Sequence, residues 1–459
     1  MSSGSPATRA RVCAPLAAAL ISALPVAAPA AEHVLPFLED DYPRALAQAK
    51  AERKLLFVDA WATWCHTCLS MKRFVLDDPG LGAVRDAVIW LAVETEAERN
   101  RDFVEKYPID GLPTFFLIDP AREEVAARWL GAGTANELRA FVQEHAAAWA
   151  ATRDTGRSPA LLATRAGDQA RQRGDLDGAA AAYRTAVRRS PAHDPQRPER
   201  LLLLATALSK LATPQAAREC AGLGLAEMGH TGSSAVAADF AAAASECAGR
   251  LPPGSAEALR LRNAARARLA ALAADEAAPL SVDDRSDALA NLAELQGGQG
   301  DRAAAMATMR RRAALLEQAA LVAPDPTLAS TFDAHRTDTY LFLGEPQKAE
   351  RMLEEREKQM PEDYNPPARL ARVLFEQGKH GLAEAAVNRA LDRMTRGPRR
   401  IGILALKAKI LKAEDKPRGE VLREELDVLR ALPRPQRRPS LEQQLEAELD
   451  ASAKGAQAR

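Results

Sequence analysis

The pattern of apolar and polar residues changes near residue 147 of this 459-residue chain. Before that point, short apolar runs such as Leu55–Trp61 and Phe115–Asp119 are bounded by charged or turn residues, and runs of this length predict buried strands. Leu69–Leu76 lies between them and has helical spacing. Beyond residue 147 the strand-like runs stop and Ala, Leu, Arg and Glu dominate, which predicts helices alone.

The helical part is periodic from about residue 159. Its first unit has the spacing Ala163-x3-Gly167-x6-Gly174-x4-Ala179-x3-Tyr183-x2-Ala186-x4-Pro191, which is typical of a tetratricopeptide helix pair. We expect Gly174 and Asp175 to form the turn between the two helices. Ala179 would let the helices approach closely, and Tyr183 would fill the gap between them.

Further helix pairs follow this unit. A second good copy spans Leu370–Ala390, a more degenerate one contains Gly300 and Asp301, and weaker pairs are predicted over 199–227, 233–274, 327–358 and 400–430. The pattern resembles tetratricopeptide-type arrays, which stack helix pairs into a superhelix and commonly bind a peptide or protein on the concave surface. An array that serves only as a spacer or dimer platform is the alternative.

The first thirty residues have the pattern of a secretory signal peptide. Arg9 and Arg11 precede the apolar run Ala14–Val26, and Ala28-Pro29-Ala30 offers small residues for cleavage. The apolar run is shorter than the roughly 20 residues that a membrane-spanning helix needs. We therefore expect export to a bacterial periplasm, with a retained N-terminal membrane anchor as the alternative.

Length and charge complete this outline. The chain is too long for one domain, and we expect a signal peptide over 1–30, an α/β domain over 31–147, a linker over 148–158, a helical repeat domain over 159–450 and a tail over 451–459. Lys plus Arg and Asp plus Glu both number 62, so the formal net charge is zero. That balance predicts no nucleic-acid partner.

The candidate chemistry lies in Trp61-Ala-Thr-Trp64-Cys65-His66-Thr67-Cys68, at the predicted turn from strand to helix. Unpaired amides and the helix dipole favour a thiolate at such a position. Two cysteines at this spacing form either a redox couple or half of a metal site. Zinc would need two more ligands, and Cys220 and Cys247 lie far away and are not closely spaced, so we predict no metal.

Cys220 and Cys247 lie on two consecutive predicted helices joined by a turn at 229–233. An oxidising compartment would permit a structural disulfide between them. Their unequal distances from the turn leave two buried free thiols as an equal alternative.

The segment from about residue 33 to 147 resembles the thioredoxin superfamily, and most closely the C-terminal domain of DsbD-type thiol:disulfide interchange proteins. The resemblance rests on Asp59, the Trp61–Cys68 segment, Asp78-Pro79, Gly111-Leu112-Pro113-Thr114 and the Phe115–Asp119 strand. It implies an α/β domain with a central mixed sheet flanked by helices, followed here by an all-α, tetratricopeptide-like solenoid.

The resemblance also implies roles for the cysteines and their neighbours. Cys65 would be the exposed nucleophile and Cys68 the resolving thiol. Asp59 would be a buried acid whose pKa is raised by burial and which accepts the proton of Cys68. Pro113 would be a cis proline beside the disulfide.

The remaining candidate residues would contact the client. Leu112 and Thr114 would pair with an extended client segment, and Trp64 would form part of the docking surface. Two interpretations of His66 stay open, because a protonated imidazole would stabilise the Cys65 thiolate, whereas a side chain directed into solvent would do little.

We therefore expect an exported thiol–disulfide oxidoreductase with no cofactor beyond the Cys65–Cys68 pair. Its partners would be proteins with cysteines or disulfides, a membrane electron donor of DsbD type, and a protein bound by the repeats. A reducing direction is implied by the resemblance only. The alternatives are a redox-silent scaffold and a maturation factor for cytochrome or metal-site cysteines.

Overall fold

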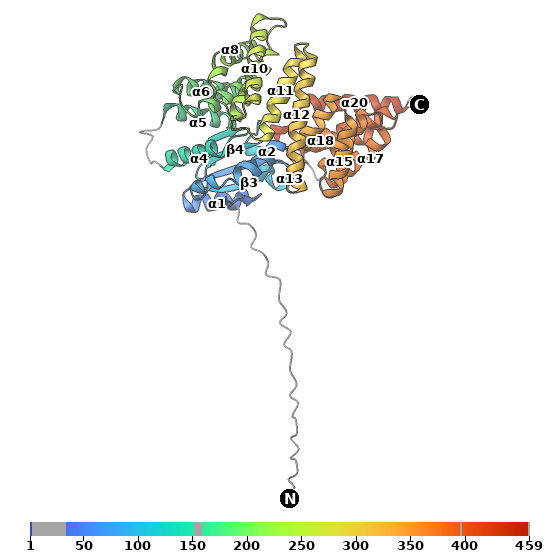
Figure 1. Cartoon of the computed structure of the whole chain (residues 1–459), viewed down its shortest axis with the longest axis horizontal. Coiled ribbons are helices and arrows are strands. Elements are labelled where there is room, and N and C mark those ends of the chain that lie inside the picture. The colour runs from blue at the N-terminus through green and yellow to red at the C-terminus, as the bar shows by residue number, and fades with distance from the viewer. Residues whose placement is uncertain (2–33, 151–157, 395–396, 458–459) are drawn as a thin grey trace. The chain divides into compact units, whose positions relative to one another are not determined.

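The computed structural model describes residue 1 and residues 34–150, 158–394 and 397–457 (Figure 1). The predicted signal peptide and the middle of the predicted linker therefore lie outside the described residues. Among the described residues, no helix combines the length and the apolar character needed to cross a membrane.

The first part of the described chain is built on a five-stranded mixed sheet in the order β1-β3-β2-β4-β5. The strands are β1 (Leu38–Glu39), β2 (Leu55–Trp61), β3 (Val88–Glu94), β4 (Thr114–Asp119) and β5 (Glu124–Leu130). β2 is parallel to β3 and antiparallel to β4, which is antiparallel to β5. The predicted Leu55–Trp61 strand matches β2, and the predicted Phe115–Asp119 strand lies within β4.

Alternate side chains of the central strands enter two different cores, as strand geometry requires. Leu56 and Val58 of β2 pack on the face covered by α1 (Tyr42–Glu52) and α3 (Arg101–Lys106). Leu55 and Phe57 belong to the core of the opposite face. The helices associated with that face are α2 (His66–Met71), its π-helical continuation η1 (Lys72–Leu76), the 3-10 helix η2 (Pro79–Val84) and α4 (Ala135–Ala150).

The helical part consists mainly of α-helices that pack against their neighbours along the chain. Its α-helices are α5 (Pro159–Gln172), α6 (Leu176–Arg189), α7 (Arg197–Lys210), α8 (Pro214–Glu227), α9 (Ala235–Ala248), α10 (Ala256–Ala274), α11 (Val282–Gly298), α12 (Arg302–Val322), α13 (Pro326–Ser330), α14 (Asp333–Leu343), α15 (Pro346–Gln359), α16 (Asn365–Glu376), α17 (His380–Arg393), α18 (Pro398–Ala413), α19 (Gly419–Ala431) and α20 (Pro439–Gln457). The predicted fold class, an α/β domain followed by an all-α array, is confirmed.

The first predicted repeat forms as the spacing indicates. Gly174 has φ +76° between α5 and α6, a left-handed conformation that favours glycine. A Cβ atom added to Gly167 would lie 2.4 Å from the Tyr183 ring, so the two helices meet at this glycine. The Tyr183 hydroxyl donates to Asp168 at 2.7 Å. At the other end of the array, α20 continues to Gln457, into the segment predicted as a tail.

The sheet and the first helices of the array share one apolar core. That core extends from Phe57 and Phe115 in the sheet to Leu292 in α11. A second core, from Tyr340 to Leu445, holds the last helices together. Because the first core is continuous, the α/β domain is not packed independently of the array.

Candidate active site

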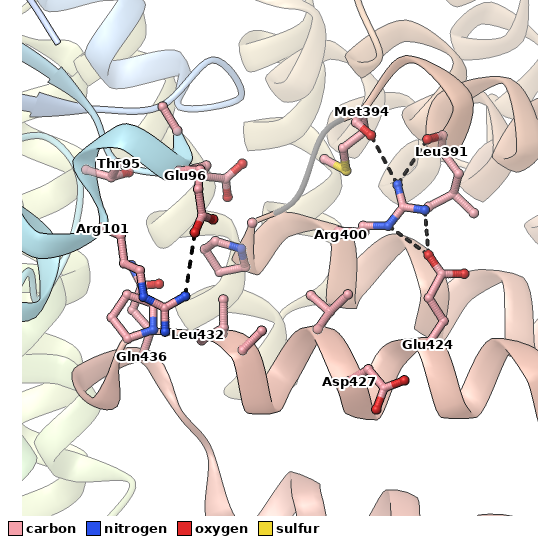
Figure 2. A pocket seen from close by; sticks show the side chains of 17 residues that line it. Thr95, Glu96, Arg101, Leu391, Met394, Arg400, Glu424, Asp427, Leu432 and Gln436 are labelled. Atoms are coloured by element: carbon pink, nitrogen blue, oxygen red, sulfur yellow. Dashed lines mark hydrogen bonds and ion pairs between the residues drawn. The ribbon is translucent and has the colours of Figure 1, made fainter.

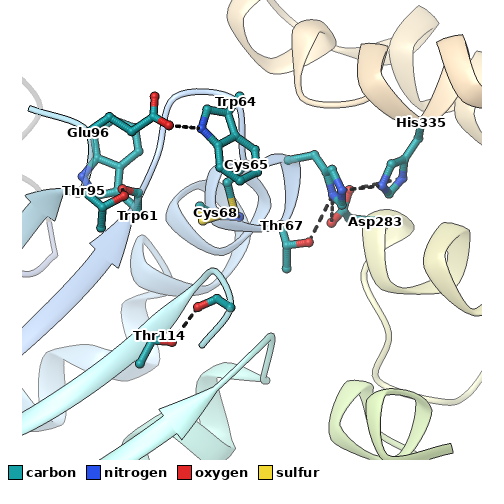
Figure 3. Close-up of a disulfide and its surroundings, with 12 residues drawn as sticks. Trp61, Trp64, Cys65, Thr67, Cys68, Thr95, Glu96, Thr114, Asp283 and His335 are labelled. Atoms are coloured by element: carbon teal, nitrogen blue, oxygen red, sulfur yellow. Dashed lines mark hydrogen bonds and ion pairs between the residues drawn. A yellow bond between two sulfur atoms is a disulfide. The ribbon is translucent and has the colours of Figure 1, made fainter. Parts of the chain in front are cut away.

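The predicted redox pair is a disulfide in the structure, located where β2 turns into α2 (Figure 3). Cys65 is the N-cap residue of α2, with an extended backbone. Its sulfur accepts a hydrogen bond from the backbone N–H of Cys68 at 3.1 Å. After reduction, the same amide and the positive end of the helix would stabilise a thiolate on Cys65.

The disulfide is covered by other parts of the chain. Cys65 is only 4% exposed and Cys68 only 1% exposed. Both pack with Ala62, and Trp64 and Leu112 lie against them. The expectation of an exposed nucleophile is therefore wrong for this arrangement, because the array covers the end of the α/β domain that carries the pair.

The loop before β4 contains the expected cis proline. The Leu112–Pro113 peptide bond is cis. The Thr114 hydroxyl donates to the Gly111 carbonyl at 2.7 Å, and the Pro113 carbonyl accepts from the Gly131 N–H at 3.0 Å. These two bonds hold the loop in place beside the disulfide. The backbone of Leu112 has no partner among the backbone hydrogen bonds of the described residues.

Asp110, just before this loop, links it to the array. Its carboxylate lies 3.0 Å from Arg128 of β5 and 2.8 Å from Lys210 of α7, and it also pairs with Arg171 of α5. Burial alone would raise the pKa of Asp110, but Arg128 and Arg171 outweigh it and lower that pKa. The carboxylate therefore stays charged and fixes the loop to two helices of the array.

Asp59 occupies the centre of β2 and is only 2% exposed. Burial raises its pKa to about 7, a shift that Lys72 opposes. One carboxylate oxygen has no hydrogen-bond partner among the described residues. The Lys72 ammonium lies 3.3 Å from the centroid of the Trp61 ring, and burial lowers its pKa. A carboxyl with a pKa near neutrality can both accept and return a proton.

Trp64 is held by groups from both parts of the chain. Its indole N–H donates to Glu96 at 3.0 Å (Figure 3). The Arg399 guanidinium lies 5.5 Å from the centroid of the Trp64 ring. The same Glu96 oxygen accepts from the Arg399 backbone N–H at 2.9 Å. The neighbouring Thr63 hydroxyl lies 3.1 Å from that of Tyr364. The array thus contacts the expected docking surface directly.

A cavity of about 570 Å³ adjoins this contact (Figure 2). It lies between the loop at Glu96 and the helices α17 to α19. Arg400 forms one wall, pairing with Glu424 at 2.5 Å and donating to the Met394 carbonyl at 3.1 Å. The cavity does not include either cysteine of the redox pair, and Glu96 connects it with Trp64.

His66 is bound by the array. Its Nδ1 lies 3.2 Å from Asp283 of α11, and its Nε2 lies 3.0 Å from the Nε2 of His335 of α14. Burial alone would lower the pKa of His66, but the hydrogen bond and charge of Asp283 outweigh it and raise that pKa. The interpretation that the His66 side chain is directed into solvent is therefore wrong.

The sequence did not identify His335 as a site residue, although its side chain is only 2% exposed and meets His66. Nothing near His335 in the sequence points to His66, 269 positions away. A signal did exist in α11, where Asp283 and Asp287 are four residues apart and hence on one helix face.

Cys220 and Cys247 are also joined, by a disulfide between α8 and α9. Both residues are fully buried, and the pair lies within the array.

Comparison with known proteins agrees with this geometry. Residues 38–120 match the family model described as thioredoxin-like. Residues 38–120 form a thioredoxin-like domain. DsbD 2 of Pseudomonas aeruginosa, a thiol:disulfide interchange protein, is 32% identical over 115 residues, which are 25% of this chain and 19% of that protein. DsbD of Pseudoalteromonas atlantica is 28% identical over 89 residues, which are 19% of this chain and 15% of that protein.

The chain spans less than a fifth of the length of these two relatives. The predicted Cys65–Cys68 motif and cis Pro113 lie in or beside the sheet of this domain. Together the domain and its CXXC pair support thiol–disulfide oxidoreductase chemistry in general.

The array has structural neighbours among solved repeat proteins. A tetratricopeptide repeat protein from Parabacteroides merdae covers 65% of this chain at 14% identity, over its full length, with a TM-score of 0.40. The Cut9–Hcn1 structure of the APC/C covers 62% of this chain and 50% of its own chain, at 11% identity and a TM-score of 0.30. The observed helix pairs, rather than these likenesses, establish that tetratricopeptide-like repeats follow the thioredoxin-like domain.

Proposed function

We propose that this protein is an exported thiol–disulfide oxidoreductase that reduces disulfides in client proteins. The observation that carries the proposal is the Cys65–Cys68 disulfide at the start of α2, beside the cis Leu112–Pro113 loop. The reducing direction is supported by the likeness of the domain to DsbD, and export by the apolar, cleavable pattern of residues 1–30.

In the proposed reaction the reduced protein donates two electrons to a client. The Cys65 thiolate attacks one sulfur of the client disulfide, and the other client sulfur leaves as a thiolate. Asp59 accepts the proton of Cys68, whose thiolate then attacks Cys65 in the mixed disulfide. The client leaves as a dithiol and the Cys65–Cys68 disulfide forms. A membrane dithiol donor of DsbD type would reduce that disulfide again.

The array would take part in choosing the client. The contacts that Tyr364, Arg399 and His335 make around the redox pair support this part of the proposal. Because these contacts leave Cys65 only 4% exposed, a client must displace them to reach the sulfur. The free energy needed for displacement would favour clients that also bind the array.

Two experiments test the proposal. The first is the reduction potential of the Cys65–Cys68 pair, obtained by equilibrating the full chain with a defined thiol buffer. A value near about −270 mV, as in thioredoxin, supports a reductase. A value near about −120 mV, as in DsbA, would instead mean that the protein donates disulfides.

The second experiment traps clients on Cys68→Ala, which leaves mixed disulfides on Cys65 unresolved. Full-length Cys68→Ala is compared with the same chain carrying Tyr364→Phe and Arg399→Ala. A changed set of trapped clients supports selection by the array. An unchanged set argues against selection, and no trapped client at all argues against the oxidoreductase.

A further inference from the structure

Four side chains from the two parts of the chain converge beside the redox pair. They are His66 of the thioredoxin-like domain and Asp283, Asp287 and His335 of the array, each of which offers one ligand atom within 4.8 Å of the others. The Nε2 atom of His335 lies 3.0 Å from that of His66 and 3.2 Å from an Asp287 oxygen. Figure 3 shows Asp283 and His335 of the array close to the loop that carries Cys65 and Thr67.

The hydrogen bonds around the two histidines suit metal binding through both Nε2 atoms. An Asp283 oxygen can accept from Nδ1–H of His66, at 3.2 Å, which leaves a lone pair on Nε2. Ser286 can accept from Nδ1–H of His335, at 2.7 Å, with the same result. Partners of this kind fix the tautomer and orientation of metal-binding histidines. The two Nε2 atoms, 3.0 Å apart, can then both bind one ion.

Two further observations point to a cation. Asp283 is completely buried, and one of its oxygens has no hydrogen-bond partner among the described residues; its nearest ion-pair partner is Nδ1 of His335 at 3.5 Å. An unpaired buried carboxylate oxygen is costly unless a cation is nearby. Asp287 and His66 keep 38% and 29% of their side chains exposed, so solvent ions can reach the cluster.

We propose that His66, Asp283, Asp287 and His335 bind one divalent transition-metal ion such as Zn²⁺. Two imidazoles and two carboxylates are ligands that Zn²⁺ accepts, whereas Mg²⁺ and Ca²⁺ prefer oxygen ligands only. Zinc bonds of about 2.1 Å in a tetrahedral site place ligand atoms about 3.4 Å apart. The separations of 3.0 and 3.2 Å around His335 are close to this value. Two carboxylates would balance the charge of the ion.

The ion would link the loop that carries His66 to α11 and α14 and so stabilise the packing of the array over Cys65. Metal binding at this site does not rest on the proposed redox function, because none of the four ligands is a cysteine. It is therefore tested on the oxidised protein, in which Cys65, Cys68, Cys220 and Cys247 are disulfide-bonded and cannot act as thiolate ligands.

The test is calorimetric titration of the untagged, oxidised full chain with Zn²⁺. Cys13 of the predicted signal peptide, the fifth cysteine of the chain, is replaced by serine so that it cannot bind the ion as a thiolate. We expect one equivalent to bind, and His335→Ala or Asp287→Asn to weaken binding at least tenfold. The control is His380→Ala, another histidine of the array that is not in the cluster, which should bind Zn²⁺ as the wild type does. His66→Gln repeats the test from the thioredoxin-like domain in case an array variant does not fold.

A second measurement locates the ion. Zn²⁺ should slow amide hydrogen exchange both in the loop around His66 and in α14 around His335, and Co²⁺ should give the visible absorption of a four-coordinate ion. Failure of the wild type to bind, or equal binding by the wild type, His335→Ala and His66→Gln, would overturn the proposal. Slowed amide exchange in only the His66 loop, or in only α14, would also overturn the proposal.

Discussion

The Nε2 atom of His66 lies 3.0 Å from the Nε2 atom of His335, although 269 positions separate the two residues. His66 stands between the two cysteines of the redox pair, and His335 belongs to α14 of the array. The contact therefore links the active-site loop of the thioredoxin-like domain directly to the array. We therefore expect the reactivity of Cys65 to depend on how stably the array packs against the thioredoxin-like domain.

Replacing His335 by alanine should make the metal-free disulfide easier to reduce. Without a metal ion, the Nε2 atom of one histidine can carry a proton and donate it to the Nε2 atom of the other, 3.0 Å away. Loss of such a hydrogen bond destabilises a contact by about 0.5–1.5 kcal/mol, which would raise the population of molecules with an accessible Cys65 about 2- to 13-fold. Reduction by a small thiol, followed by tryptophan fluorescence in the presence of a chelator, should accelerate by the same factor. His380→Ala is the matched control. Equal rates for wild type and His335→Ala would mean that the array does not limit access.

The sequence predicted those features whose signals are local. β2, the α5–α6 pair and the turn at Gly174 follow from short periodic patterns, and Cys65, Cys68 and Pro113 follow from their motifs. These patterns depend only on residues close together in the chain. They are sufficient to predict the fold class.

The burial of Cys65 by the array could not be predicted in this way. It depends on where α11 and α14 lie after many helix pairs have stacked, and small rotations per pair accumulate along such an array. His335 has no motif around it that indicates a partner. Its role follows only from the packed arrangement, in which it meets His66.

Gly167→Ala should destabilise the first helix pair. The added Cβ would lie 2.4 Å from the Tyr183 ring, which is itself only 1% exposed and cannot move freely. Overpacking of this kind costs about 1–3 kcal/mol. Urea unfolding, monitored by circular dichroism, should show a lower midpoint.

A matched control exists in α8. Gly222 also lies inside a helix, but a Cβ there would meet nothing within 4 Å. Gly222→Ala should therefore stabilise the array by up to about 1 kcal/mol, because alanine is the better helix former. Destabilisation of both variants to the same extent would show that helix packing at Gly167 is not the cause.

Removing the disulfide between Cys220 and Cys247 should lower stability without altering the redox pair. The bond closes a chain segment with a sequence separation of 27 residues, for which loop-closure entropy predicts a loss of about 3.5 kcal/mol. The double variant Cys220→Ala, Cys247→Ala should unfold at a lower urea concentration. Its Cys65–Cys68 reduction potential should remain that of the wild type, and a changed potential would indicate exchange between the two pairs.

Asp59 should make the stability of the oxidised protein depend on pH. Burial raises its pKa to about 7, above the value of 3.8 expected in the unfolded chain, although Lys72 opposes the shift. Between about pH 4 and 7 the folded state therefore holds a proton that the unfolded state has released. The resulting stability is complete below pH 4 and is lost as pH rises through 7. The difference between the two pKa values corresponds to on the order of 4 kcal/mol.

Asp59→Asn isolates this contribution. Burial also raises the pKa of Glu94 and that of Asp168 to about 7, so the wild-type profile alone does not identify the group responsible. Both acids are retained in the variant, and their effects cancel in the difference between the two proteins. Urea unfolding of the oxidised chains at pH 5, 6, 7 and 8 should show the wild type losing stability relative to Asp59→Asn as pH rises. A difference that is constant across this range would mean that Asp59 does not titrate there, and it could not then serve as the proton acceptor for Cys68 near neutral pH.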